Sequence, residues 1–151
     1  MEAKPAGNGL LAILISSKHS ESEVKHIYIQ KWEIITEINT TGVAKQIFGY
    51  DMVVAEHSSA HGIATYVRQG TADVIVIESS TNNNIYRSVI RIGVLSITNV
   101  YKSPQAKWND PLMINQPHPA LYAGDFNSHH TEWGYSSNDE NGELVETWAS
   151  N

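Results

Sequence analysis

Long runs of β-branched residues between positions 73 and 101 constrain the fold of this chain most strongly. Residues 73–77 are almost all valine and isoleucine, which predicts a strand covered on both faces. Polar residues 81–84 then predict a hairpin turn. The run 85–101 that follows has Gly93 at its centre, and its odd-numbered residues share one face of the predicted strand. The sequence therefore predicts a fold built on β-sheet.

Other segments fill in the expected architecture. The apolar patch 10–15 fits a short helix or a strand, and its periodicity does not choose between them. Strands are further expected at residues 26–29, 50–55, 63–67 and 120–123. Residues 102–118 contain several prolines and predict an irregular connection with one helical turn at most. Near the end, Asp139 is a candidate helix N-cap, and Leu144, Val145 and Trp148 mark one apolar helix face.

Composition narrows the class of protein. A chain of 151 residues with 41% hydrophobic content fits one globular domain. Its net charge of −6 argues against binding nucleic acid through a broad basic surface. The absence of cysteine excludes disulfides and thiolate metal sites, so a reducing compartment is the default. With no long apolar run and no convincing signal peptide, we expect an intracellular protein, nuclear or cytoplasmic, without a membrane partner.

The strand expected at 120–123 leads into a group of polar side chains. Gly124 closes the apolar run, and Asp125 and Asn127 follow with one residue between them. In extended backbone these two side chains point to the same face, while Phe126 points back into the core. Carboxylate and amide oxygens at a strand's exit can share a hard cation, or hold a water or phosphate oxygen. The alternative is an ordinary aspartate turn leading into a polar loop.

Two other positions carry groups that suit phosphate chemistry. Asn99 and Tyr101 share one face at the end of their strand, where an amide and a phenol can donate to a phosphate oxygen, although a packed tyrosine is the alternative. His129 and His130 are adjacent and should point apart, so one of them lines a cleft or both are loop residues. The spacing of His57 and His61 suits zinc only in a helix, and the intervening sequence predicts solvated loop histidines instead.

The stretch Gly124-Asp125-Phe126-Asn127-Ser128-His129-His130, with Thr131-Glu132-Trp133-Gly134 after it, resembles the Gly-Asp-Phe-Asn signature of the endonuclease/exonuclease/phosphatase superfamily. More narrowly, it is similar to the apurinic-type endonuclease domain of non-LTR retrotransposons. Those domains also have a strand ending in Asn-x-Tyr, matched here by Asn99-Val100-Tyr101 with Ser103-Pro104 beyond it. The resemblance covers residues 45–151 well and residues 6–44 poorly, so residues 1–44 are expected to be a degenerate N-terminal part of the domain.

The resemblance implies a fold, a reaction and a partner. The fold would be α/β, with two packed mixed β-sheets flanked by helices in a four-layer sandwich. The reaction would be hydrolysis of a DNA phosphodiester with Mg²⁺ or Mn²⁺ held by Asp125. Asp125 would orient or deprotonate the attacking water, Asn127 would hold phosphate or water, and Tyr101 would brace a phosphate oxygen. The resemblance further places Asn99, His129 and His130 at the substrate.

Several positions depart from the family pattern. Ala6 and Lys31 stand where the family has an asparagine and the metal-binding glutamate, and Glu33 is the nearest replacement for that glutamate. The family's catalytic Ser-Asp-His triplet does not occur in this sequence, and the chain stops where the family continues, so we expect a domain lacking its C-terminal part. We therefore expect weak or no activity. The alternatives are a non-catalytic retroelement remnant, or a phosphatase or phosphodiesterase acting on a substrate other than nucleic acid.

Overall fold

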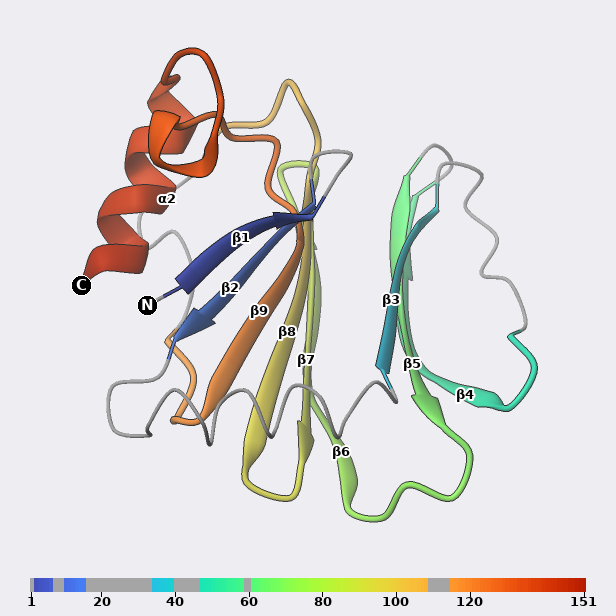
Figure 1. Ribbon diagram of the computed structural model, residues 1–151. Coiled ribbons are helices and arrows are strands. Elements are labelled where there is room, and N and C mark those ends of the chain that lie inside the picture. The colour runs from blue at the N-terminus through green and yellow to red at the C-terminus, as the bar shows by residue number, and fades with distance from the viewer. Residues whose placement is uncertain (1, 7–9, 16–33, 40–46, 59–60, 109–114) are drawn as a thin grey trace.

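A computed structural model describes residues 2–6, 10–15, 34–39, 47–58, 61–108 and 115–151 (Figure 1). Its strands are β1 (Glu2–Ala6), β2 (Leu10–Ile15), β3 (Ile34–Asn39), β4 (Tyr50–His57), β5 (Gly62–Arg68), β6 (Val74–Asn82), β7 (Ile85–Ile92), β8 (Leu95–Lys102) and β9 (Ala120–Asp125). A 3₁₀ turn, η1 (Thr131–Trp133), and one helix, α2 (Glu140–Ser150), complete the described elements. No described helix has the length and apolar character needed to cross a membrane.

The strands form two sheets. One is six-stranded with the order β1-β2-β9-β8-β7-β6, and the other is three-stranded with the order β3-β5-β4. The three-stranded sheet is antiparallel, whereas the six-stranded sheet is mixed because β8 and β9 run parallel. The carboxyl ends of β8 and β9 therefore meet at the same edge of the sheet, which is where the candidate residues lie.

Figure 1 shows the two sheets face to face, with α2 against the outer face of the larger one. The cluster between the sheets is aliphatic and contains Val67, Ile90, Ile92, Leu95 and Ile97. The cluster beneath α2 is rich in aromatic residues and contains Val100, Trp108, Ala120, Tyr122, Phe126, Trp133, Val145 and Ala149. The described residues thus form a helix layer and two sheet layers, which confirms the predicted α/β class and its two packed sheets.

Strand alternation divides the side chains of β8 and β9 between these two cores. Val100 packs toward α2, while Asn99 and Tyr101 face the three-stranded sheet. On β9, Tyr122 packs toward α2, and Phe126 just beyond the strand is only 1% exposed. The predictions that Asn99 and Tyr101 share a face and that Phe126 points into the core are both confirmed.

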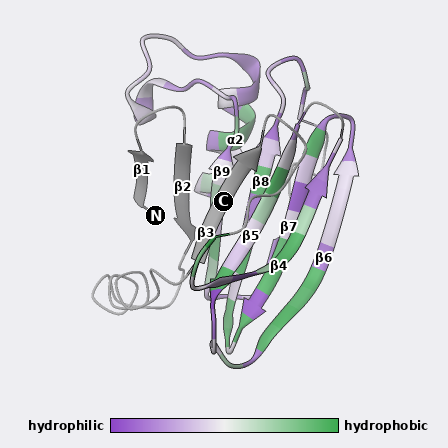
Figure 2. Ribbon diagram, turned by 90° about the vertical axis from the view of Figure 1, so that its right-hand side faces the viewer, coloured by the Kyte–Doolittle hydropathy of each residue, from purple (hydrophilic) through white to green (hydrophobic). Residues whose placement is uncertain are grey.

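The expectation that residues 73–77 are covered on both faces is wrong. Ile75, Val76 and Ile77 are 46%, 47% and 46% exposed, because β6 is an edge strand paired only with β7 (Figure 2). The apolar face predicted for the last helix is also partly wrong, since Leu144 is 43% exposed while Val145 and Ala149 are buried. In both places there are more apolar side chains than the neighbouring elements cover.

Three remaining expectations concern single segments. Residues 10–15, which fitted either a helix or a strand, form strand β2. In the connection predicted to be irregular, the described residues 103–108 and 115–118 contain no helix. The strand expected at residues 26–29, together with Lys31 and Glu33, lies outside the described residues.

Candidate functional site

The candidate site begins with a close approach between β8 and β9. Tyr101 and Asp125 are in register on these parallel strands. Gly124 precedes Asp125 with a φ of 143°, and a Cβ at this position would lie 1.8 Å from the carbonyl oxygen of Val100. Only glycine allows the two backbones to come this close. The glycine of the signature therefore has a structural task, which is to bring Asp125 beside Tyr101.

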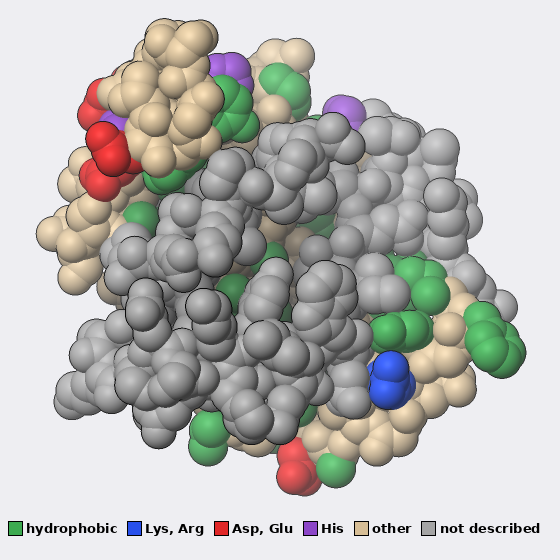
Figure 3. Space-filling view, viewed as in Figure 1, with side chains coloured by type: hydrophobic (Ala, Val, Ile, Leu, Met, Phe, Trp, Pro, Cys, Tyr) green, Lys and Arg blue, Asp and Glu red, His purple; other side chains and the backbone are tan. Residues whose placement is uncertain are grey.

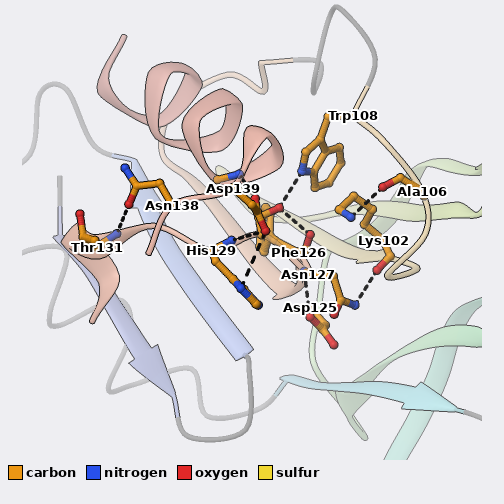
Figure 4. Close-up of polar contacts among 12 residues, drawn as sticks. Lys102, Ala106, Trp108, Asp125, Phe126, Asn127, His129, Thr131, Asn138 and Asp139 are labelled. Carbon is orange, nitrogen blue, oxygen red and sulfur yellow. Dashed lines mark hydrogen bonds and ion pairs between the residues drawn. The ribbon is translucent and has the colours of Figure 1, made fainter. Parts of the chain in front are cut away.

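A compact turn holds the end of β9. The backbone N–H of Asn127 donates to Asp125 Oδ1 at 3.0 Å, and the side-chain Nδ2 of Asn127 donates to the carbonyl of Lys102 at 2.7 Å (Figure 4). Asn127 has a φ of 41°, so the chain here is not the extended backbone assumed from the sequence. Asparagine tolerates this left-handed conformation better than most residues. Asn127 thereby ties the end of β9 to the end of β8.

Burial changes the acid–base properties of Asp125 and Tyr101. Desolvation raises the pKa of Asp125, and the Asn127 hydrogen bond and the Lys102 charge oppose this shift without cancelling it. Desolvation is also the main cause that raises the pKa of the Tyr101 phenol, with the negative charge of Asp125 adding to it. The site therefore contains a carboxylate that is easier to protonate than usual, beside a phenol that keeps its proton.

The raised pKa of Asp125 predicts a pH-dependent stability effect for Asp125→Asn. Below the ordinary carboxyl pKa of 3.8 the group is neutral in both folded and unfolded chains, so the substitution should be nearly neutral. As the pH rises through the folded-state pKa, ionisation disfavours the folded wild type. We expect Asp125→Asn to have the higher urea midpoint at pH 7 and no advantage at pH 3. Asp73→Asn, at an exposed position, is the control, and equal effects of the two changes at pH 7 would contradict the argument.

Lys102 was not singled out from the sequence, yet it is fully buried next to the site. Its Nζ donates to the carbonyl oxygens of Ser103 at 3.2 Å and Ala106 at 2.9 Å. Burial lowers the pKa of its ammonium group, against the opposing charges of Asp139 and Asp125. This lysine shapes the loop after β8 and supplies positive charge near Asp125. The signal was available in the alternation of β8, which places residue 102 on the same buried face as Val100.

The two histidines of the signature have different partners, as their adjacency predicted. His130 is 8% exposed, and its Nδ1 accepts the backbone N–H of Glu132 at 3.3 Å as the cap of η1. The His129 ring is stacked on Tyr135, with centroids 4.4 Å apart. The backbone N–H of His129 donates to Asp139 Oδ2 at 3.2 Å. His129 thus fastens the signature loop to the segment that leads into α2, whereas His130 caps η1.

Asn99 lies deep between the sheets. It is 1% exposed, and its Nδ2 donates to the carbonyl oxygen of Ala64 and to Thr65 Oγ1, both at 3.2 Å. These hydrogen bonds join β8 of the larger sheet to β5 of the smaller one. The structure therefore brings Tyr101, Asp125 and Asn127 together, and it places Asn99 beneath them in the core.

His61 is a second residue that the sequence did not assign to the site. It was expected to be a solvated loop histidine, but it is partly buried and its Nδ1 lies 3.4 Å from the hydroxyl of Tyr101. The two ring centroids are 5.5 Å apart. The contact joins the start of β5 to the end of β8 across the two sheets. Residues 40 positions apart in sequence make this contact, so local patterns gave no signal for it.

Among the described residues only one carboxylate, that of Asp125, lies at the site, and this limits how a metal could be held. Within the described part of the chain, no three histidine or acidic side chains are grouped closely enough to hold an ion by themselves. Magnesium, however, is commonly bound through one or two carboxylates, with water and substrate phosphate as its other ligands. Asp125 fits that mode. Ala6 stands where the family that the sequence resembles has an asparagine. It pairs with Leu10 of β2, and Leu10 pairs with Asp125 of β9, so the three residues lie in one row across the sheet.

This site belongs to a chain for which comparison gives no relatives. Family models, curated protein sequences and solved structures were each compared with it, and none matches. What this chain does is therefore inferred from the signature residues and from the geometry around Asp125.

Proposed function

We propose that this chain is a divalent-metal-dependent phosphodiester hydrolase domain of the endonuclease/exonuclease/phosphatase type, DNA endonuclease-like, with weak turnover. One observation carries the proposal. The signature aspartate and the tyrosine of the Asn-x-Tyr strand, 24 positions apart in sequence, lie in register at the end of the one parallel strand pair of the described sheets. The superfamily's four-layer sandwich is the fold that we propose for the whole domain.

Asp125 is the central residue of the proposed site. Mg²⁺ or Mn²⁺ would supply Lewis-acid polarisation of the phosphate and stabilise the charge of the leaving oxygen. Asp125 would hold this ion, or would orient an attacking water and take its proton. A carboxyl group whose burial raises its pKa is better suited to accept a proton near neutral pH than a solvated one.

Tyr101 and Asn127 would position the phosphate. The phenol of Tyr101 keeps its proton, since burial and Asp125 raise its pKa, and it can donate that proton in a hydrogen bond to a phosphate oxygen. Asn127 donates from its side-chain Nδ2 to the carbonyl of Lys102, and its side chain also hydrogen-bonds to Asp125, which places the amide beside the proposed position of phosphate or water. Its backbone N–H fixes the orientation of the Asp125 carboxylate.

Weak turnover is expected from the missing catalytic groups. The sequence contains no Ser-Asp-His triplet, and alanine and lysine stand at positions 6 and 31. A general acid–base partner contributes about 10²- to 10⁴-fold to a rate, and catalytic groups that act as a unit are lost as a unit. We therefore expect plasmid nicking by the purified chain near background. Robust nicking that EDTA stops would overturn this part of the proposal.

A small phosphodiester is the second candidate substrate. The net charge is −6, and acidic side chains gather at the end of the molecule where α2 and the segment before it lie (Figure 3). Long polyanions are repelled by such a surface, whereas a small substrate can be held by one metal ion and a few hydrogen bonds. A retroelement-derived remnant that folds poorly, or that only binds, is the non-catalytic alternative.

Metal binding tests the proposed function directly. We would titrate Mn²⁺ into the wild type, Asp125→Asn and Asp73→Asn and follow the free ion by electron paramagnetic resonance. The wild type and Asp73→Asn should bind one Mn²⁺ equally well. Asp125→Asn should bind it at least about tenfold more weakly, because the one carboxylate that the described residues bring to the site is gone. Identical binding by all three chains would contradict the assignment of Asp125.

A further inference from the structure

We infer that His61 is a positioning residue of the phosphate site, and that it controls where the hydroxyl of Tyr101 directs its proton. This inference rests on the proposed function and adds to it a residue from the second sheet. The observation behind it is the contact between His61 Nδ1 and the Tyr101 hydroxyl, 3.4 Å long and partly buried. The site is then assembled from both sheets, with Asp125 from one and His61 from the other.

The surroundings of Tyr101 explain why its orientation needs a partner. The Tyr101 ring packs between two others, with its centroid 5.5 Å from that of His61 and 5.8 Å from that of Tyr86. Tyr86 is itself fixed, since its hydroxyl donates to Ser58 Oγ at 2.8 Å. Ser58 Oγ in turn accepts the backbone N–H of His61 at 3.2 Å. The His61 backbone and both tyrosines therefore belong to one hydrogen-bonded cluster.

The direction of the hydrogen bond depends on the tautomer of the His61 ring. The phenol of Tyr101 carries its proton at neutral pH, as tyrosine ordinarily does, so its hydroxyl can donate to Nδ1 or accept from it. With the ring proton on Nε2, the tautomer expected in the unliganded chain, the hydroxyl donates and His61 Nδ1 accepts. In this arrangement the Tyr101 proton points at His61 and is withheld from a ligand.

Binding of a phosphate group requires this arrangement to reverse. The hydroxyl must rotate its proton toward a phosphate oxygen, which turns an oxygen lone pair toward His61. An imidazole that carries its proton on Nδ1 can donate to that lone pair, so histidine supports both directions of the hydrogen bond. Asparagine can do the same by flipping its amide, whereas leucine, of nearly the same size and shape, supports neither.

The test uses protein labelled with ¹⁵N in its histidine rings and ¹³Cζ in its tyrosines. The Tyr101 signal is assigned by its loss in Tyr101→Phe, and inorganic phosphate is the probe. In the wild type we expect His61 to show the Nε2–H tautomer, and Tyr101→Phe should remove that preference. Phosphate should shift the Tyr101 signal. His61→Leu should weaken phosphate binding about 5- to 10-fold, as expected for one lost hydrogen bond, while His61→Asn should stay within about 2-fold of the wild type.

The outcomes separate this inference from the proposed function. Equal phosphate affinity in the wild type, His61→Leu and His61→Asn overturns the role of His61 and leaves the phosphate site in place. A His61 tautomer that is unchanged in Tyr101→Phe also overturns that role, and this measurement needs no variant at position 61. A wild type whose Tyr101 signal ignores phosphate overturns the proposed function and this inference with it. The other tyrosine signals report whether each variant keeps its fold.

Discussion

Gly124→Ala is expected to destabilise the fold by about 4 kcal/mol or more, the range found when a substitution forces a steric clash on strained backbone. The added Cβ would lie 1.8 Å from the carbonyl oxygen and 2.7 Å from the carbonyl carbon of Val100, both backbone atoms of β8. Relief would require β8 and β9 to separate at the one parallel pairing of the described sheets. Domains of this size are stable by only about 5–15 kcal/mol, so much of the variant should be unfolded.

Gly93→Ala provides the matched control for this experiment. Gly93 also has a positive φ, 58°, but an added Cβ would meet no atom within 4 Å. Its expected cost is about 1 kcal/mol, from the left-handed conformation alone. Urea unfolding followed by circular dichroism compares the two. If both substitutions cost the same, the close approach of β8 and β9 is not what requires glycine at position 124.

Gly142→Ala is expected to destabilise the chain by about 2–3 kcal/mol, although alanine is the better helix former. Gly142 lies in the first turn of α2, and its added Cβ would lie 1.8 Å from the carbonyl oxygen of His129. Asp139 links Gly142 to the backbone of His129. Its Oδ1 accepts the N–H of Gly142 at 2.6 Å, and its backbone N–H donates to the carbonyl oxygen of His129 at 2.9 Å. The helix and the signature loop are therefore packed without room for a methyl group.

The sign of the Gly142 effect makes this prediction easy to test. Helix propensity alone would give a stabilisation of about 1 kcal/mol. Thr147→Ala, at an exposed position of the same helix, should change the free energy of unfolding by less than about 0.5 kcal/mol. A rise in stability for Gly142→Ala, measured by urea unfolding, would show that α2 does not rest on the His129 backbone.

Local sequence patterns predicted much of the six-stranded sheet. The run 85–101 is strand as expected, but it is not one strand whose odd-numbered residues share a face, because Gly93 lies in the turn between β7 and β8. The pairing of Ile90 with Ile97 places even-numbered residues of β7 on the same face as odd-numbered residues of β8, so that part of the prediction is wrong. Alternation also predicted that Asn99 and Tyr101 share a face and that Phe126 is buried. These features depend on the two-residue period of a strand, which a single sequence displays directly.

Features set by pairing across the fold could not be predicted in this way. The apolar run of β6 did not reveal that it is an edge strand, because edge position depends on which strand pairs with it. Asn127 leaves the extended conformation because Lys102 O and Asp125 Oδ1 offer hydrogen bonds that alternation ignores. His61 reaches Tyr101 only because two sheets pack face to face. The signature residues could be predicted because they are neighbours in sequence. That Lys102 and His61 are their partners could not be predicted, because only the fold brings them to the site.

The location of a bound metal shows most directly whether Asp125 forms a divalent-metal phosphodiester site with Tyr101 and Asn127. Crystals of the chain would be soaked in Mn²⁺ with inorganic phosphate, and the anomalous scattering of manganese would place the ion. We expect a peak about 2.1–2.3 Å from a carboxylate oxygen of Asp125, with phosphate within hydrogen-bond distance of the Tyr101 hydroxyl. A manganese ion bound elsewhere, with Asp125 left free of both metal and phosphate, would contradict this assignment.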